Sequence, residues 1–286
     1  MLTIFGDESH DEKKQEVFAV VGIAAPQEVW DKLSPIWLER LNGRVFHAAD
    51  CESNRGDFKN YSHEENLTLY KDLTNILASS DYNCVGFGSA IDIRMFKLYF
   101  PNSDIAICYH LNFLFVIAQF AAIACEMPPH TAQFIFDSNQ ETQSNAGLLF
   151  DQISKLQGID IDKLKDCIGD VSFNYKPKKT GVQCADLFAR EVMKNINNRY
   201  YKPRWNFLCA NQPCSPRTRR KSWDALYNTG RFTYMDIGIE ILSTLRSTYA
   251  DIDATKFAEW LNKTGVVDNI SNRIKYIDIW EKDHQR

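Results

Sequence analysis

Residues 17–25 read VFAVVGIAA, a run in which every side chain is apolar or absent, and Pro26 follows it directly. A short, continuous apolar run rich in valine is typical of a strand that is buried on both faces. Residues 2–5 (LTIF) form a second short run, and the polar stretch 11–16 separates the two. This pattern predicts a β-hairpin at the start of the chain.

Helical and strand patterns alternate after this hairpin. Trp30, Leu33 and Trp37 recur at helical spacing and predict a helix over 27–41. Further helices are predicted over 64–78, 105–125, 143–156 and 181–197, and strands over 44–49, 82–91, 132–136 and 167–173. Apolar strands separated by helices favour an α/β fold, a mixed sheet with helices on both faces. We expect this core domain to span 1–198.

The composition changes after residue 198. Residues 199–286 are rich in aromatic, asparagine and basic residues, with helical patterns near 236–249 and 255–263. We expect them to form an appended, mostly helical C-terminal subdomain with basic and aromatic surface. The chain of 286 residues is 44% hydrophobic and 24% charged, which excludes a disordered or coiled-coil protein.

The cysteines and the N-terminus favour a cytoplasmic protein. The eight cysteines include no CxxC pair, so we expect free thiols and a reducing compartment. Acidic residues follow the N-terminus within ten positions, so no signal peptide is visible. Residues 105–127 are apolar but interrupted by His110, Asn112 and Gln119. A buried core helix is therefore expected there, not a membrane span.

Two predicted strands run into an aspartate. Residues 2–5 lead to Asp7, and 132–136 lead to Asp137. If these strands are parallel neighbours, both carboxylates emerge at one edge of the sheet, where α/β proteins bind ligands. Asp186 lies in an apolar helix turn and needs a cation, a donor or a metal. Three such carboxylates could hold a divalent cation such as Mg²⁺.

The same acids also have structural interpretations. Asp7 could open a turn, Asp137 could cap the next helix, and Asp186 could pair with Arg190, which shares a helix face with Gln183 and Asp186. Residue types alone leave both interpretations open.

Four motifs in order resemble the family of bacterial and phage proteins called domain of unknown function 3800. They are FGDES at 5–9, FHAAD at 46–50, the strand-end Asp137 and GVQCADL at 181–187. The resemblance covers about 1–198. It implies a ribonuclease H-like fold with acids placed as in metal-dependent nucleases, and a setting in phage defence or mobile elements.

By this resemblance, the metal ligands are Asp7, Asp137 and Asp186, holding Mg²⁺ or Mn²⁺. The helical glutamate of ribonuclease H has no clear counterpart, so His47, Asp50 or Glu8 could replace it. His47, expected in a short strand with Asp50 three residues on, could be a metal ligand or a general base. A half-buried, purely structural histidine is the other interpretation.

A basic segment surrounds Asp186. Residues 176–221 hold 12 Lys and Arg but only two acids, in a chain of net charge −4. Basic side chains interleaved with aromatic ones suit single-stranded nucleic acid, although a solvated surface is the alternative. The candidate nucleic-acid contacts are Lys176, Lys178, Lys179, Arg190, Lys194, Lys202 and Arg204.

The sequence thus supports two hypotheses. The first is a metal-dependent nuclease that hydrolyses phosphodiester bonds of RNA or DNA, with Asp7, Glu8, His47, Asp50, Asp137 and Asp186 as candidate catalytic residues. The second is a non-catalytic module on the same fold that binds nucleic acid or a partner protein. The missing fourth carboxylate favours the second.

Overall fold

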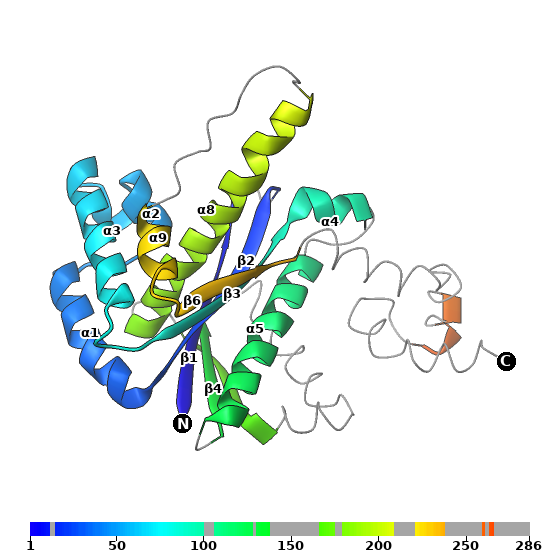
Figure 1. Cartoon of the computed structure of the whole chain (residues 1–286), viewed down its shortest axis with the longest axis horizontal. Coiled ribbons are helices and arrows are strands. Elements are labelled where there is room, and N and C mark those ends of the chain that lie inside the picture. The colour runs from blue at the N-terminus through cyan, green and yellow to red at the C-terminus, as the bar shows by residue number, and fades with distance from the viewer. Residues whose placement is uncertain are drawn as a thin grey trace.

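A six-stranded mixed sheet forms the centre of the protein in the computed structural model (Figure 1). The structure describes residues 1–11, 15–99, 106–127, 130–137, 166–174, 179–208, 221–237, 259–260 and 263–265. The strands are β1 (Leu2–His10), β2 (Val17–Pro26), β3 (Val85–Asp92), β4 (Ala132–Asp137), β5 (Ile168–Asn174) and β6 (Phe232–Asp236). Their order is β5-β4-β1-β2-β3-β6.

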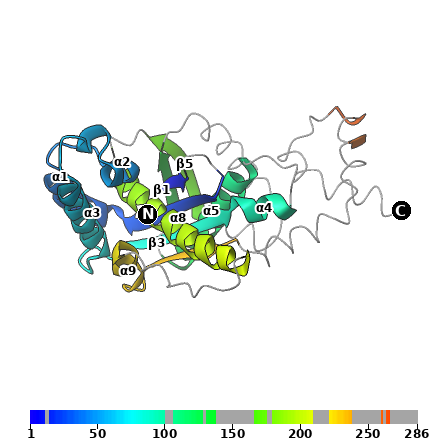
Figure 2. The ribbon, with the colours of Figure 1, turned by 90° about the horizontal axis from the view of Figure 1, so that it is seen from above.

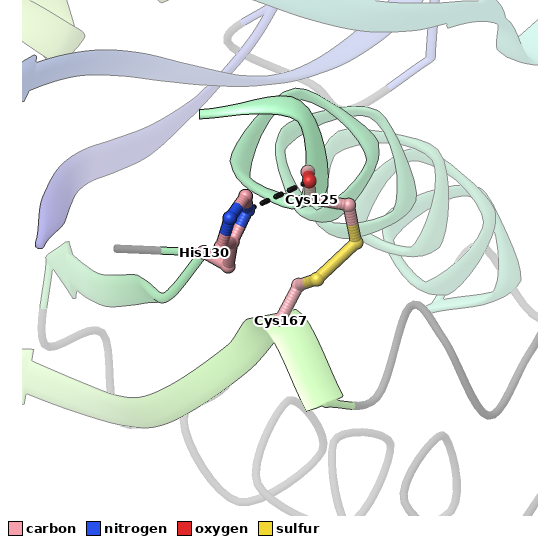
Figure 3. Close-up of a disulfide and its surroundings, with 3 residues drawn as sticks. All are labelled: Cys125, His130 and Cys167. Carbon is pink, nitrogen blue, oxygen red and sulfur yellow. Dashed lines mark hydrogen bonds between the residues drawn. A yellow bond between two sulfur atoms is a disulfide. The ribbon is translucent and has the colours of Figure 1, made fainter. Parts of the chain in front are cut away.

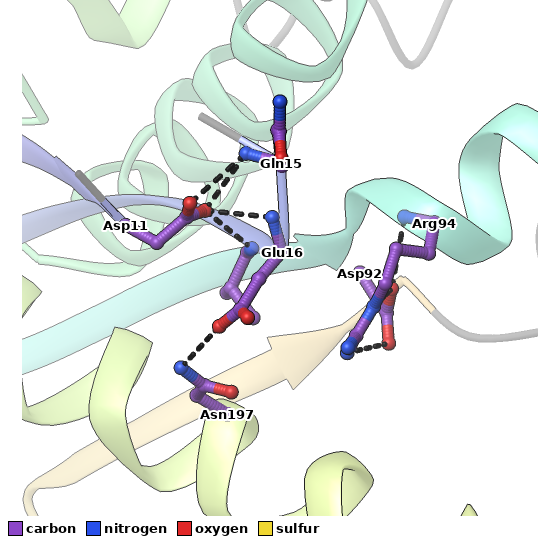
Figure 4. A network of polar contacts seen from close by, with 7 residues as sticks. Asp11, Gln15, Glu16, Asp92, Arg94 and Asn197 are labelled. Atoms are coloured by element: carbon purple, nitrogen blue, oxygen red, sulfur yellow. Dashed lines mark hydrogen bonds and ion pairs between the residues drawn. The ribbon is translucent and has the colours of Figure 1, made fainter. Parts of the chain in front are cut away.

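The strand directions agree with the predicted hairpin at the start of the chain. β2 runs antiparallel to both β1 and β3, whereas β4 pairs with β1, β5 with β4 and β6 with β3 in parallel. The polar connection between β1 and β2 is organised by Asp11, whose carboxylate accepts hydrogen bonds from the backbone N–H groups of Gln15, Glu16 and Val17 (Figure 4). The predicted antiparallel start of the sheet is therefore confirmed.

Helices cover both faces of the sheet, as Figures 1 and 2 show from two directions. The helical elements are α1 (Gln27–Leu41), α2 (Ala48–Ser53), the short 3-10 turn η1 (Gly56–Phe58), α3 (His63–Ala78), α4 (Ile93–Tyr99), α5 (Ala106–Glu126), α8 (Thr180–Leu208) and α9 (Lys221–Tyr227). One face packs against α1, α3 and α8, and the other packs against α5. The expected α/β class, a mixed sheet with helices on both faces, is confirmed.

Two packing details place the helices on the sheet. Gly181, at the start of α8, lies so close to β1 that a Cβ atom there would overlap the ring of Phe5. On the opposite face, Phe113 and Phe120 of α5 are fully buried. Residues Cys108–Glu126 are long and apolar enough to cross a membrane by length and composition. Their contacts with the sheet make α5 a core helix, as the sequence predicts.

The strand predicted over 44–49 is wrong. Residues 44–47 have no regular structure, and α2 begins at Ala48 with His47 as its N-cap residue. The short apolar pattern reflects Phe46, which is fully buried and anchors the entry to α2. Alanine at the first two positions and an acid in the first turn favour a helix.

Three further boundaries differ from the prediction. β1 continues through Asp7 to His10, because all its residues pair with β2. α8 extends to Leu208, so the domain boundary expected at 198 falls inside a helix. β6, from the expected C-terminal subdomain, joins the sheet beside β3. The predicted helix over 143–156 lies outside the described residues.

The expectation that every cysteine is free is wrong for one pair. Cys125, near the end of α5, forms a disulfide with Cys167, just before β5 (Figure 3). The two residues are 42 positions apart, so the fold and not a local motif brings them together. Cys51, Cys84, Cys108 and Cys184 are free and buried, as expected of small apolar side chains. Cys209 and Cys214 lie outside the described residues.

Candidate functional site

Asp7 and Asp137 occupy adjacent positions where the parallel pairing of β1 and β4 ends. β1 and β4 are paired in a register that places Gly6 opposite Phe136, directly before the two aspartates. Asp7 is buried, with 4% of its surface exposed, and its Oδ1 accepts a hydrogen bond of 2.8 Å from the backbone N–H of Glu8. The predicted parallel neighbourhood of the two strands is confirmed.

Both aspartates face the side of the sheet that α8 covers. Asp7 lies opposite Val21, which belongs to the same core cluster as Ala185 of α8. Side chains alternate between faces along a strand, so Asp137 shares a face with Ile135 of this cluster. The sheet therefore directs both carboxylates toward the helix that carries Asp186.

Glu8 points to the opposite face. Its cross-strand partner is Val20, which belongs to the core cluster around α5. Because directly opposite residues share a face, Glu8 lies on the side of the sheet away from Asp7. As a candidate fourth ligand beside Asp7, Glu8 is therefore unsuitable in this fold.

Asp186 is buried on α8 and contacts the start of α2. Its exposed fraction is 5%, and its Oδ2 accepts a hydrogen bond of 2.7 Å from the backbone N–H of Ala48. Arg190, which the sequence suggested as an alternative partner of Asp186, has an ion-pair partner on α2. This partner is Glu52, at 2.7 Å between Nε and Oε2.

His47 and Asp50 form an exposed pair at α2. The distance from His47 Nδ1 to Asp50 Oδ2 is 3.5 Å, and Arg55 Nε lies 3.8 Å from Asp50 Oδ1. The exposed fractions of the His47 and Asp50 side chains are 46% and 34%. The sequence predicts a half-buried His47 in a strand. The residue instead precedes α2 and is exposed. Both side chains are accessible to a substrate.

The cysteine next to Asp50 does not add a reactive group. Cys51 is fully buried, and burial raises the pKa of its thiol to about 12, although the nearby Arg44 acts in the opposite direction. A thiol with such a pKa is protonated at neutral pH and is a poor nucleophile or metal ligand.

The described residues contain no preformed metal site. Among them, no three His, Cys, Asp or Glu side chains gather in a group that could hold a metal ion. The donor types still fit, since Asp7, Asp137 and Asp186 offer only carboxylate oxygens. The three residues come from β1, β4 and α8, which pack against one another.

The basic segment is described only in part. Lys179 is exposed and Lys194 is half-buried, whereas the guanidinium of Arg190 is engaged by Glu52. Lys202 and Arg204 continue the helical backbone of α8. Lys176 and Lys178 lie outside the described residues. Arg190 is therefore less suited to bind phosphate than its sequence context suggests.

Sequence reasoning overlooked two buried polar residues, Asp92 and Gln183. Asp92 ends β3 and pairs with Arg94 at 3.0 Å (Figure 4). The strand-end pattern that singled out Asp137 also applies to Asp92. Gln183 accepts hydrogen bonds from the indole N–H of Trp37 and from the backbone N–H of Phe46, both at 3.2 Å. Only the fold reveals those two donors.

Comparisons with known proteins identify no family. No family model matches the chain, and no curated protein matches it. Among solved structures, it is similar to a chain of the PCNA:RNase HII complex from Archaeoglobus fulgidus, at 13% identity and a TM-score of 0.33. The similarity covers 82% of this chain and 92% of the other. A likeness of this degree supports no statement about activity.

Proposed function

We propose that the chain is a Mg²⁺- or Mn²⁺-dependent nuclease that hydrolyses phosphodiester bonds of RNA or DNA. The observation that carries the proposal is the adjacent placement of Asp7 and Asp137 on β1 and β4, facing the helix that carries Asp186. Carboxylates from separate elements on one edge of an α/β sheet suit a cation that bridges phosphate oxygens.

Each side chain has a part in this proposal. Asp7, Asp137 and Asp186 would hold the metal, which when bound activates a water molecule and stabilises the leaving oxygen. Clustered carboxylates repel one another, so their approach is unfavourable until a cation neutralises them. His47, exposed beside Asp50, would accept a proton from the attacking water.

The basic segment would guide the substrate. Lys179 lies directly before α8, and Lys194 lies on α8 after Asp186. Lysine side chains in such positions neutralise phosphates and release counterions. Nucleic acid is therefore the proposed partner. The four buried thiols outside the disulfide favour the cytoplasm as the proposed location, and the Cys125–Cys167 disulfide is the observation against it.

One observation favours the second candidate, a non-catalytic module that binds nucleic acid or a protein. Asp186 already accepts a backbone hydrogen bond from Ala48, and no group of three metal-ligating side chains is preformed in the described part of the chain. In such a module, Asp186 would be structural and the basic segment alone would bind.

Metal titration separates the two candidates. Mg²⁺ and Mn²⁺ are titrated calorimetrically into the unmodified protein and into Asp7→Asn and Glu8→Gln. Glu8→Gln is the matched control, because it removes one carboxylate from the same strand on the opposite face. If the chain is a nuclease, the unmodified protein binds the metal ion. Asp7→Asn should then weaken metal binding by at least about tenfold, and Glu8→Gln should leave it unchanged. Equal binding in all three proteins would contradict the metal site.

A cleavage assay tests the reaction itself. Labelled single- and double-stranded RNA and DNA are incubated with Mg²⁺ or Mn²⁺, with a chelator as the control. Cleavage that needs the metal and is lost in Asp7→Asn supports the nuclease. Binding of the same substrates without cleavage under any metal condition supports the module.

A further inference from the structure

Three side chains on one face of α8 hold three successive points of the segment 46–52. Gln183 accepts a hydrogen bond from the backbone N–H of Phe46, Asp186 accepts one from Ala48, and Arg190 pairs with Glu52. The spacing i, i+3 and i+7 keeps the three on one side of the helix. The segment they hold carries both His47 and Asp50.

The first of these contacts, between Gln183 and Phe46, has a fixed geometry. The side chain of Gln183 is buried, with 1% exposed, and its Oε1 receives two donors, the indole N–H of Trp37 and the backbone N–H of Phe46. Two donors on one oxygen fix the amide orientation. The residue directly before His47 is thereby tied to both α1 and α8.

The last contact is a partly buried ion pair. The side chains of Arg190 and Glu52 are each 15% exposed, and the distance from Nε to Oε2 is 2.7 Å. A charge-assisted hydrogen bond of this length in a partly desolvated place is stronger than an exposed ion pair. It secures the C-terminal half of α2.

α2 needs these external contacts. It has only six residues, and its N-cap residue His47 makes no side-chain capping hydrogen bond. A helix of this length is not stable by itself, so tertiary contacts must set its orientation. The direction of the His47 and Asp50 side chains therefore depends on α8.

We infer that Arg190, acting through Glu52, is a positioning residue that holds α2 with His47 and Asp50 at the candidate site, together with Gln183. This inference rests on the proposed function. It replaces the expectation that Arg190 binds a phosphate group of the nucleic acid. The charge of this guanidinium is already neutralised by the partly buried carboxylate of Glu52, which weakens its attraction for a phosphate group.

Glu52→Gln distinguishes the two roles of Arg190. If Arg190 binds phosphate, the removal of Glu52 frees the guanidinium, and nucleic-acid affinity rises or stays unchanged. If Arg190 positions α2, Glu52→Gln and Arg190→Gln have the same effect. We expect both to lower kcat by roughly ten- to a hundredfold, the scale of a displaced catalytic group, with KM within about twofold.

Two further variants complete the experiment. The exchange Arg190→Glu with Glu52→Arg restores the pair in reverse, and we expect it to recover most of the lost kcat. Lys194→Gln removes a proposed phosphate contact one turn further along α8 and is the reference for the loss of such a contact. We expect Arg190→Gln to leave the salt dependence of binding unchanged, in contrast to a lost phosphate contact, which lowers the log–log slope by about one.

A second readout does not depend on cleavage. The ring-proton resonances of His47 and the amide exchange of Ala48 are followed by NMR in the same variants. We expect both signals to change in Arg190→Gln and Glu52→Gln and to return in the exchanged pair. If the unmodified protein does not cleave nucleic acid, the proposed function is contradicted. The NMR signals of His47 and Ala48 would still test the positioning role of Arg190. Unchanged signals, or tighter binding in Glu52→Gln, would overturn the inference.

Discussion

The carboxylate of Asp186 on α8 accepts a hydrogen bond of 2.7 Å from the backbone N–H of Ala48, the first residue of α2. Ala48 is fully buried, so its N–H has no access to water. Asp186 thus supplies, from 138 positions away, an acceptor for one of the first N–H groups of α2, which have no partner within the helix. The negative charge also lies at the positive end of the short helix.

Replacement of Asp186 should separate its structural role from its metal role. Asp186→Ala leaves the buried N–H of Ala48 without its acceptor, so we expect a loss of about 1–3 kcal/mol in the free energy of unfolding. Asp186→Asn keeps an amide oxygen in place and should lose less than about 1 kcal/mol. Urea unfolding measures both values.

Metal affinity provides the second half of this prediction. Asp186→Asn should lose divalent binding while it remains folded, because an amide is a weaker ligand than a carboxylate. A folded Asp186→Asn protein with full metal affinity would show that Asp186 only stabilises α2. Glu8→Gln, on the opposite face of the sheet, is the control for removal of a carboxylate charge.

How much of this site the sequence could predict depends on the range of each interaction. The helix at 27–41 follows from local spacing, and its observed bounds agree with the prediction. Asp7 and Asp137 are also predictable, because an acid that follows an apolar run is a local pattern, although β1 continues past Asp7 to His10. Their adjacency needs only the parallel pairing of β1 and β4.

The errors come from contacts between distant segments. The entry to α2 looks like a strand because Phe46 is apolar, but Gln183 and Asp186 fix its backbone from α8. Arg190 looks like a phosphate contact because the sequence does not show that Glu52 lies opposite. The disulfide joins cysteines that no short motif connects.

Reduction of the Cys125–Cys167 disulfide should destabilise the protein. The bond closes a loop across a sequence separation of 42 residues, which includes β4 and Asp137. Loop-closure entropy for this separation corresponds to about 4 kcal/mol of stability. We expect Cys125→Ser to unfold at a lower urea concentration. Reductant should lower the urea midpoint of the unmodified protein by a similar amount and leave the midpoint of Cys125→Ser unchanged. A lower midpoint of Cys125→Ser in reductant would indicate another reducible bond.

The free thiols should make the protein sensitive to alkaline pH. Burial raises the pKa of both Cys51 and Cys84 to about 12, against a reference value of 9.0. The unfolded thiols ionise above pH 9 while the folded ones stay protonated, so this contribution to stability is complete below pH 9 and declines toward pH 12. As the pH rises above 9, the urea midpoint of Cys84→Ala should fall less steeply than that of the unmodified protein. In the native protein, a thiol reagent at pH 8 should label neither residue.

Charge reversal should show whether the basic segment binds nucleic acid. Lys179→Glu and Lys194→Glu should weaken binding and lower the log–log salt slope by about one unit for each lost phosphate contact. Fluorescence anisotropy with a labelled single strand at several salt concentrations measures both quantities. Lys71→Glu on α3 is a control outside this segment. An unchanged slope would identify the segment as a solvated surface.

His47 provides the most direct test of the proposed chemistry. Because its side chain is 46% exposed and lies before α2, His47→Gln should change the thermal midpoint little. Loss of a general base usually costs about a hundredfold or more in turnover, so we expect a decrease on that scale in metal-dependent cleavage. Asp50→Asn, which removes the partner 3.5 Å from the ring, should cause a smaller decrease. Cleavage rates measured with folded protein at equal concentration decide the matter: normal turnover in His47→Gln would exclude a catalytic role, and a lower thermal midpoint would assign His47 to the stability of α2.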